Sequence, residues 1–193
     1  MRLEWSGLRR PPVPPRVAAA IAPGGGERLL AWAVDAVGGG TVVAGRHRLY
    51  AVATGPTTGA EPAPATGAEP GPDAARVTLS RPWHLVDAGS WSGEDGILRV
   101  SWVDGHPPAR FVLSEPGMLP ETLRERVQAS VVLAEVLDLG ERRTARVVVR
   151  RDLASGALLS QAVLGSGVRS TDPGVAEQLR EGLERVREQT GLT

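Results

Sequence analysis

The chain has 193 residues, of which 41% are hydrophobic and 23% charged, a composition typical of a folded globular protein and not of a disordered segment. Its 22 basic and 22 acidic residues cancel, so the net charge gives no overall attraction to nucleic acid or to an anionic membrane. Cysteine is absent, which excludes disulfides, thiolate chemistry and the usual structural zinc sites and removes any need for an oxidising compartment.

Residues 1–26 are predicted to form an N-terminal arm rich in proline and glycine. The cluster at positions 11–15 favours extended polyproline II structure, and a short helical turn is expected over residues 16–21. The apolar run at positions 17–22 is too short for a signal peptide or a membrane span, so we expect neither. Trp5 stands alone near the prolines, where it either packs back on the domain or anchors a partner.

Residues 27–133 are predicted to form a β-rich domain. Two antiparallel strands are expected on either side of the glycines at 38–40, and residues 55–75, which repeat TGAEP, are expected to form a flexible inserted loop. Further β segments, separated by Gly, Asp or Pro, are ARVTLSRPWHLVDAGSW, GILRVSWVDG and ARFVLSE. In the second of these, Leu98, Val100 and Trp102 share one face, which predicts a strand with one buried side.

A helix is predicted to begin at Leu119, because Pro120 and Glu121 suit its first turn. Its apolar stripe is expected to extend to Ala134, since apolar or small residues recur at three- and four-residue spacing at Leu123, Val127, Ser130, Val131 and Ala134.

Residues 134–193 are predicted to form a β-hairpin and a final helix, as an extension packed on the same unit. The hairpin strands are RRTARVVVRRD and ALLSQAVLG, and Asp172 and Pro173 are expected to cap and open the helix. The helix has a narrow apolar stripe that is expected to cover the hairpin face made of Ala145, Val147 and Val149.

Three strings, GTVVAGRHRLYAV, RPWHLVDAGSWSGEDGILRVSWVDG and LPETLRERVQASVV, resemble actinobacterial proteins that carry a bacterial pleckstrin-homology-like domain. The resemblance covers roughly residues 27–132. It implies an α+β fold in which an antiparallel, strongly curved sheet is closed by a helix. It also implies scaffolding or partner binding in place of chemistry, although fold alone does not determine function.

The motifs of common active sites are absent from the sequence. The glycine clusters precede strands, and no lysine follows them as a P-loop requires; Gly89 to Gly93 has Trp91 where a nucleophile elbow needs serine. His47, His84 and His106 lack metal-ligand spacing. We therefore predict no catalytic, cofactor-binding or metal-binding residue. The alternative is a small-molecule site or enzyme at the mouth of the barrel, with His84, Asp87 and nearby arginines as its polar groups.

Two charged rows are candidate interaction surfaces. On the first hairpin strand, one face is predicted to be basic and solvated, or to contact an anion, RNA or an acidic protein; it carries Arg142, Arg146 and Arg150. On the final helix, an acidic row is predicted on the side opposite the apolar stripe. This row is expected to be solvated or to contact a basic partner, and it comprises Glu177, Glu181, Glu184 and Glu188.

Taken together, these features predict a non-catalytic, cytoplasmic interaction or scaffold module that needs no cofactor. Its partner is expected to be a protein and not a membrane. Nucleic-acid binding through the arginine-rich hairpin is a weaker alternative, and the pathway and the oligomeric state are left open.

Overall fold

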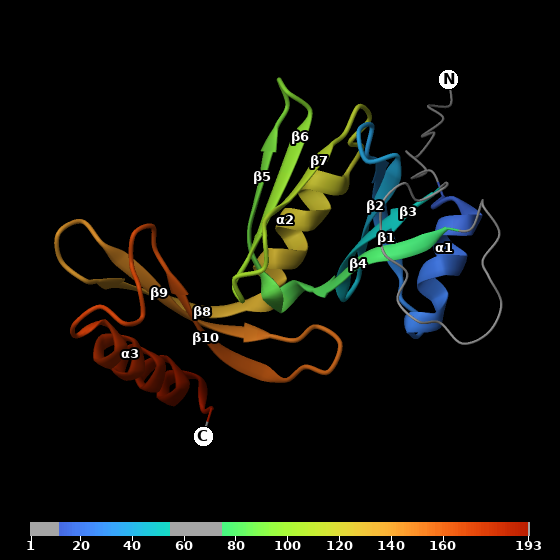
Figure 1. The fold of residues 1–193 in the computed structure, drawn as a ribbon. Coiled ribbons are helices and arrows are strands. Elements are labelled where there is room, and N and C mark those ends of the chain that lie inside the picture. Colours follow the sequence, from blue (N-terminus) through green and yellow to red (C-terminus); the bar gives the residue numbers. More distant parts are fainter. Residues whose placement is uncertain (1–11, 55–74, 193) are drawn as a thin grey trace, which may run out of the picture.

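A computed structural model describes residues 12–54 and 75–192 and shows an α+β fold, with three antiparallel sheets and three α-helices in these residues (Figure 1). The strands are hydrogen-bonded as three separate sheets, of four, three and three strands, and not as one strongly curved sheet. Trp5 and most of the predicted inserted loop, residues 55–74, lie outside the described residues.

The first sheet contains four strands that pair in sequence order: β1 (Leu29–Val34), β2 (Gly40–Gly45), β3 (Arg48–Ala53) and β4 (Arg76–Pro82). Helix α1 (Pro15–Ile21) covers one face of this sheet through Val17 and Ile21, which agrees with the predicted helical turn. The prediction of two strands before residue 54 was wrong. The chain reverses at Arg46 and His47, where the His47 amide donates to the Glu27 carboxylate at 2.5 Å.

The second sheet has the order β5 (Val86–Ser92), β6 (Ile97–Trp102) and β7 (Ala109–Val112). The segment ARVTLSRPWHLVDAGSW, which we took as one β segment, is divided after Pro82 by a 3₁₀ turn, Trp83–Leu85. Trp83 is fully buried and its indole N–H donates to the Gly45 carbonyl at 3.0 Å, so this turn is fixed to the first sheet.

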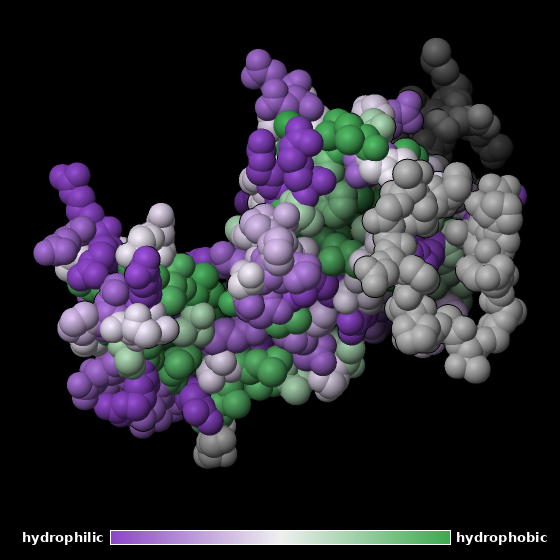
Figure 2. Space-filling model, in the orientation of Figure 1, coloured by the Kyte–Doolittle hydropathy of each residue, from purple (hydrophilic) through white to green (hydrophobic). Residues whose placement is uncertain are grey.

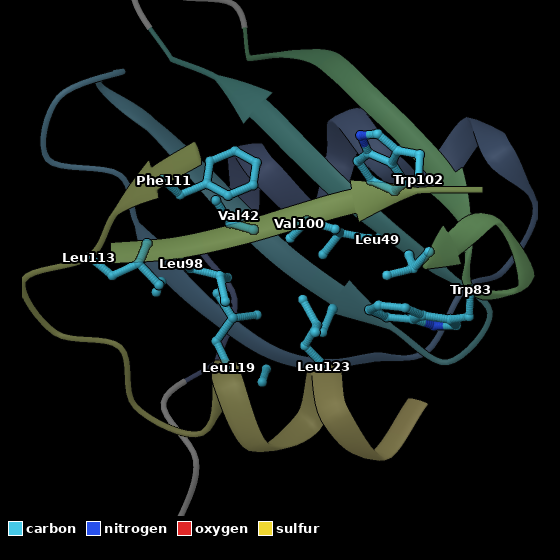
Figure 3. Close-up of a cluster of buried hydrophobic side chains, with 14 residues drawn as sticks. Val42, Leu49, Trp83, Leu98, Val100, Trp102, Phe111, Leu113, Leu119 and Leu123 are labelled. Carbon is cyan, nitrogen blue, oxygen red and sulfur yellow. The ribbon is translucent and has the colours of Figure 1, made fainter. Parts of the chain in front are cut away.

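Helix α2 (Leu119–Ser130) closes the first seven strands by packing on a core shared by both sheets (Figure 3). Figure 3 shows Leu119 and Leu123 directed from the helix toward this core. Glycine on β5 allows a close approach, because a Cβ at Gly89 would lie 2.2 Å from a methyl group of Leu123, which would have to move. The other large core side chains are Val42, Leu49, Trp83, Leu98, Val100, Trp102, Phe111 and Leu113.

The third sheet is larger than predicted, since a strand precedes the expected hairpin. Helix α2 ends at Ser130, and the chain continues directly into β8 (Val131–Asp138), which pairs with β9 (Thr144–Arg151); β9 pairs in turn with β10 (Leu158–Leu164). The helical stripe predicted to reach Ala134 was therefore wrong beyond Ser130. The run of β-branched and apolar residues from Val131 favours the strand.

Helix α3 (Val175–Thr190) lies on one face of the third sheet (Figure 1). The predicted docking is confirmed: Val175, Leu179 and Val186 pack in one cluster with the alternate apolar residues of β9, Ala145, Val147 and Val149. Asp172 does not cap the helix, because α3 begins after Gly174. Its carboxylate instead accepts the Arg169 amide at 3.1 Å and pairs with Arg143.

The burial of Trp102 supports a stability test of the β6 register. Trp102 is 6% exposed, and its indole N–H donates to the Pro107 carbonyl at 3.0 Å. Trp102→Ala is expected to lower the free energy of unfolding by about 3 to 5 kcal/mol, as truncation of a buried aromatic does. Val37→Ala, at a 77% exposed position, is the control and should change it by less than about 0.5 kcal/mol. Urea unfolding measures both; similar values for the two variants would contradict this packing.

Candidate functional site

The face of β9 opposite α3 meets the first seven strands through a buried arginine. Arg150 is 2% exposed, and its guanidinium lies between the start of β5 and the end of α2. Nη1 donates to the Val86 carbonyl at 2.8 Å and to the Ser130 hydroxyl at 3.4 Å. A buried cation is tolerated only where such acceptors replace water, so these contacts fix the third sheet against the rest of the fold.

Asp87, on β5, supplies the opposite charge. The Arg146 Nη2 atom lies 2.6 Å from Asp87 Oδ1, and the Arg150 Nη2 atom lies 3.9 Å from the same oxygen and 3.5 Å from the Asp87 carbonyl. Burial lowers the pKa of Arg150, and Asp87 opposes this by favouring the charged guanidinium. Two guanidinium groups therefore share one carboxylate, which leaves an excess positive charge at this junction.

His84 makes a second contact across the junction. Its Nδ1 atom lies 3.6 Å from Oδ1 of Asp152, in the turn between β9 and β10. Burial lowers the pKa of His84, although Asp152 works in the other direction. Burial also opposes ionisation of Asp152, but hydrogen bonds from the Ser155 hydroxyl and the Ala154 amide outweigh it and lower that pKa. The imidazole is therefore neutral near pH 7 beside a charged carboxylate.

The three candidate arginines do not form one basic surface. Arg142 lies in the turn before β9 with a φ of 61°, Arg146 pairs with Asp87, and Arg150 is buried. The predicted solvated face was wrong for Arg150, because β5 and the end of α2 cover that half of the β9 face. The polar groups of the alternative small-molecule site, His84, Asp87, Arg146 and Arg150, lie at this junction. There, Arg146 and Arg150 share the Asp87 carboxylate, and His84 lies beside Asp152.

The acidic row of α3 lies on its exposed side, as predicted; its members are Glu177, Glu181, Glu184 and Glu188. Arg180, on the same helix, pairs with Glu177 at 3.3 Å and with Glu184 at 3.2 Å, so part of the row is neutralised locally. Arg185 also reaches Glu135 on β8 at 2.5 Å. None of these pairs involves the arginines of the hairpin strand.

Sequence reasoning missed the apolar residues of β8. Val132 and Val136 are exposed, and the exposed fraction of Val136 is 66%. Val136 also lines a hollow of about 320 Å³ between β5 and the third sheet. Figure 2 shows hydrophobic surface between the hairpin of β5 and β6 and the third sheet. The run from Val131 to Leu133 could have indicated this strand, because consecutive β-branched residues favour a strand over a helix. The hollow is lined by Asp87, Val136, Thr144, Ala145, Arg146, Val163, Leu164 and Gly165.

No family model, curated protein or solved structure shows significant similarity to this chain. Within residues 12–54 and 75–192, no three His, Asp or Glu side chains are grouped in a way that would hold a metal ion. No helix in the same residues has the length and apolar character needed to cross a membrane.

Removal of Arg150 tests the role of the junction in stability. Arg150→Ala is expected to lower the free energy of unfolding by about 3 to 5 kcal/mol, because it leaves the Val86 carbonyl without this donor and opens a cavity where the buried side chain lay, although Asp87 keeps Arg146. The neighbouring Arg151 is exposed, so Arg151→Ala is a matched control with an expected change below about 0.5 kcal/mol. Equal urea midpoints for the two variants would show that the junction contributes little.

His84 gives the junction a pH dependence whose sign follows from its lowered pKa. An unfolded histidine has a pKa of about 6.5, so as the pH falls through that value the unfolded state binds a proton that folded His84 resists. The free energy of unfolding should therefore fall between neutral pH and the folded pKa, and His84→Gln should make that slope shallower. Urea unfolding at a series of pH values measures the slopes; identical slopes would contradict the assignment.

Proposed function

We propose that this protein is a non-catalytic interaction module, in which the exposed face of strand β8 binds a partner protein. The observation that carries the proposal is the exposure of Val132, Ala134 and Val136 on one face of β8. On β9, the same sheet face is covered at Val148 and Arg150 by the junction. Contiguous apolar residues on a rigid sheet are typical of a protein-binding surface.

The chemistry around this face favours one kind of partner. The apolar residues border Arg146, which shares Asp87 with Arg150, so the hollow has an apolar side and an excess positive charge. A protein that presents apolar side chains next to a carboxylate complements both features. Nucleic acid fits less well, because Arg150 is buried and Arg146 is already paired.

The order of the elements supports the resemblance to pleckstrin-homology-like domains, which we retain as part of the proposal. Seven strands are followed by α2, which packs on a core shared by both sheets, and this is the order that the resemblance implies. On this view the first unit is the scaffold, and the third sheet with α3 supplies the contact surface. We place the module in the cytoplasm, in line with a cysteine-free composition.

A charge introduced on the exposed face of β8 tests the proposal. Val136→Glu should fold normally, because the side chain is exposed, but should weaken a partner contact by placing a charge in an apolar interface. Val37→Glu is the matched control, since Val37 is also an exposed valine but lies in the turn between β1 and β2.

Immobilised parent and variant proteins are compared by quantitative capture from a lysate of the source organism, after their melting temperatures have been shown to agree. A partner retained by the parent and by Val37→Glu, but reduced about tenfold or more by Val136→Glu, supports the proposal, since a buried unpaired charge costs more than 1.4 kcal/mol. Equal capture by both variants, or no reproducible partner, overturns it.

A further inference from the structure

Strand β10 is an outermost strand of the third sheet, and among the described residues it pairs only with β9 (Figure 1). Its sequence, LLSQAVL, contains no charge and no proline. The opposite outer strand, β8, carries Glu135 and Asp138. Because charge and proline are the usual protection of an edge strand against pairing, β10 is the unprotected edge of this sheet.

The hydrogen bonds at the two ends of β10 establish which backbone groups face outward. The Gly165 amide donates to the Thr144 carbonyl at 2.9 Å, and the Asp152 amide donates to the Ala157 carbonyl at 2.8 Å. Hydrogen-bonded pairs alternate along an antiparallel ladder, so the groups that face β9 belong to the odd-numbered residues. The outward N–H and C=O groups belong to the even-numbered ones: Leu158, Ser160, Ala162 and Leu164.

The sequence of β10 is nearly palindromic about Gln161. In an antiparallel pair of two copies centred there, Leu158 lies opposite Leu164, Leu159 opposite Val163, and Ser160 opposite Ala162. The even-numbered pairs would be the hydrogen-bonded ones, which matches the groups that face outward. Every cross-strand pair then joins residues of similar character, and no two charges meet.

We propose that two copies of this chain dimerise through β10, with Gln161 on the two-fold axis. Antiparallel edge pairing joins the two third sheets into one sheet of six strands in the order β8, β9, β10, β10, β9, β8. Both α3 helices then lie on the same face, and the interface is isologous, as a two-fold dimer requires. The contact surface differs from the β8 face of the proposed function, so either proposal can fail without the other.

Gln161 adds a specific contact to this pairing. Its side-chain carbonyl accepts no hydrogen bond from the residues that the structure describes. In the dimer, the two Gln161 residues would form a non-hydrogen-bonded backbone pair, in which the side chains are closest. The carbonyl oxygen is buried in the single chain, so the side chain has to rotate toward the edge for the two amides to bond to each other.

A charge-exchange experiment tests both the edge and the register. Sedimentation of the parent over a hundredfold concentration range should show twice the chain mass at the upper end. Gln161→Lys alone and Gln161→Glu alone should each raise the dissociation constant by about tenfold or more, because like charges meet on the axis. An equimolar mixture of the two should recover the dimer, and added salt should weaken that recovery.

A second variant keeps the test independent of changes at Gln161. Ser160→Pro removes an outward N–H, which an edge strand tolerates, and by symmetry the dimer loses two hydrogen bonds. It should melt as the parent does but sediment as a monomer. A parent that is monomeric at every concentration, or a dimer that both Gln161 variants and Ser160→Pro leave intact, would overturn the inference. Failure of the mixture to recover the dimer would overturn the register centred on Gln161.

Discussion

The position of the third sheet depends on one buried guanidinium. Removing a cation from water costs several kcal/mol, and the acceptors around Arg150 offset that cost only when β9, β5 and the end of α2 have their observed arrangement. Ser130 is both the last residue of α2 and an acceptor of this arginine, and Val131 begins β8 directly after it. The exit of the third sheet from α2 is therefore fixed by the chain on one side and by Arg150 on the other.

This constraint divides one face of the third sheet into two unlike halves. On β9, Val148 and Arg150 are covered, and this part of the face contributes to stability. On the outer strand β8, the same face is not covered, and its apolar side chains Val132, Ala134 and Val136 remain exposed. The surface proposed for partner binding thus results from a sheet whose outer strand β8 lies beyond the structure that covers β9. The opposite face has no such division, because α3 spans all three strands.

Sequence patterns predicted best where a residue's environment is set by its own element. The alternation of Leu98, Val100 and Trp102 predicted a buried face because side chains in a strand alternate. The stripe on α3 predicted its docking on Ala145, Val147 and Val149 for the same local reason. The division of TVVAGRHRLYAV into two strands was missed, since the turn at Arg46 and His47 depends on Glu27, twenty residues earlier than His47.

The junction around Arg150 could not be predicted in this way. Periodicity shows which residues share a face of a strand, but it does not show whether another part of the chain covers that face. Arg146, Val148 and Arg150 alternate like the outer face of any two-layer sheet, and a basic row of this kind is ordinarily solvated. One signal pointed the other way: Val148, in the middle of the polar row, is buried beside Arg150. An apolar residue between two arginines gains nothing from exposure. A valine at this position is consistent with a face that other strands partly cover, and the structure has this arrangement.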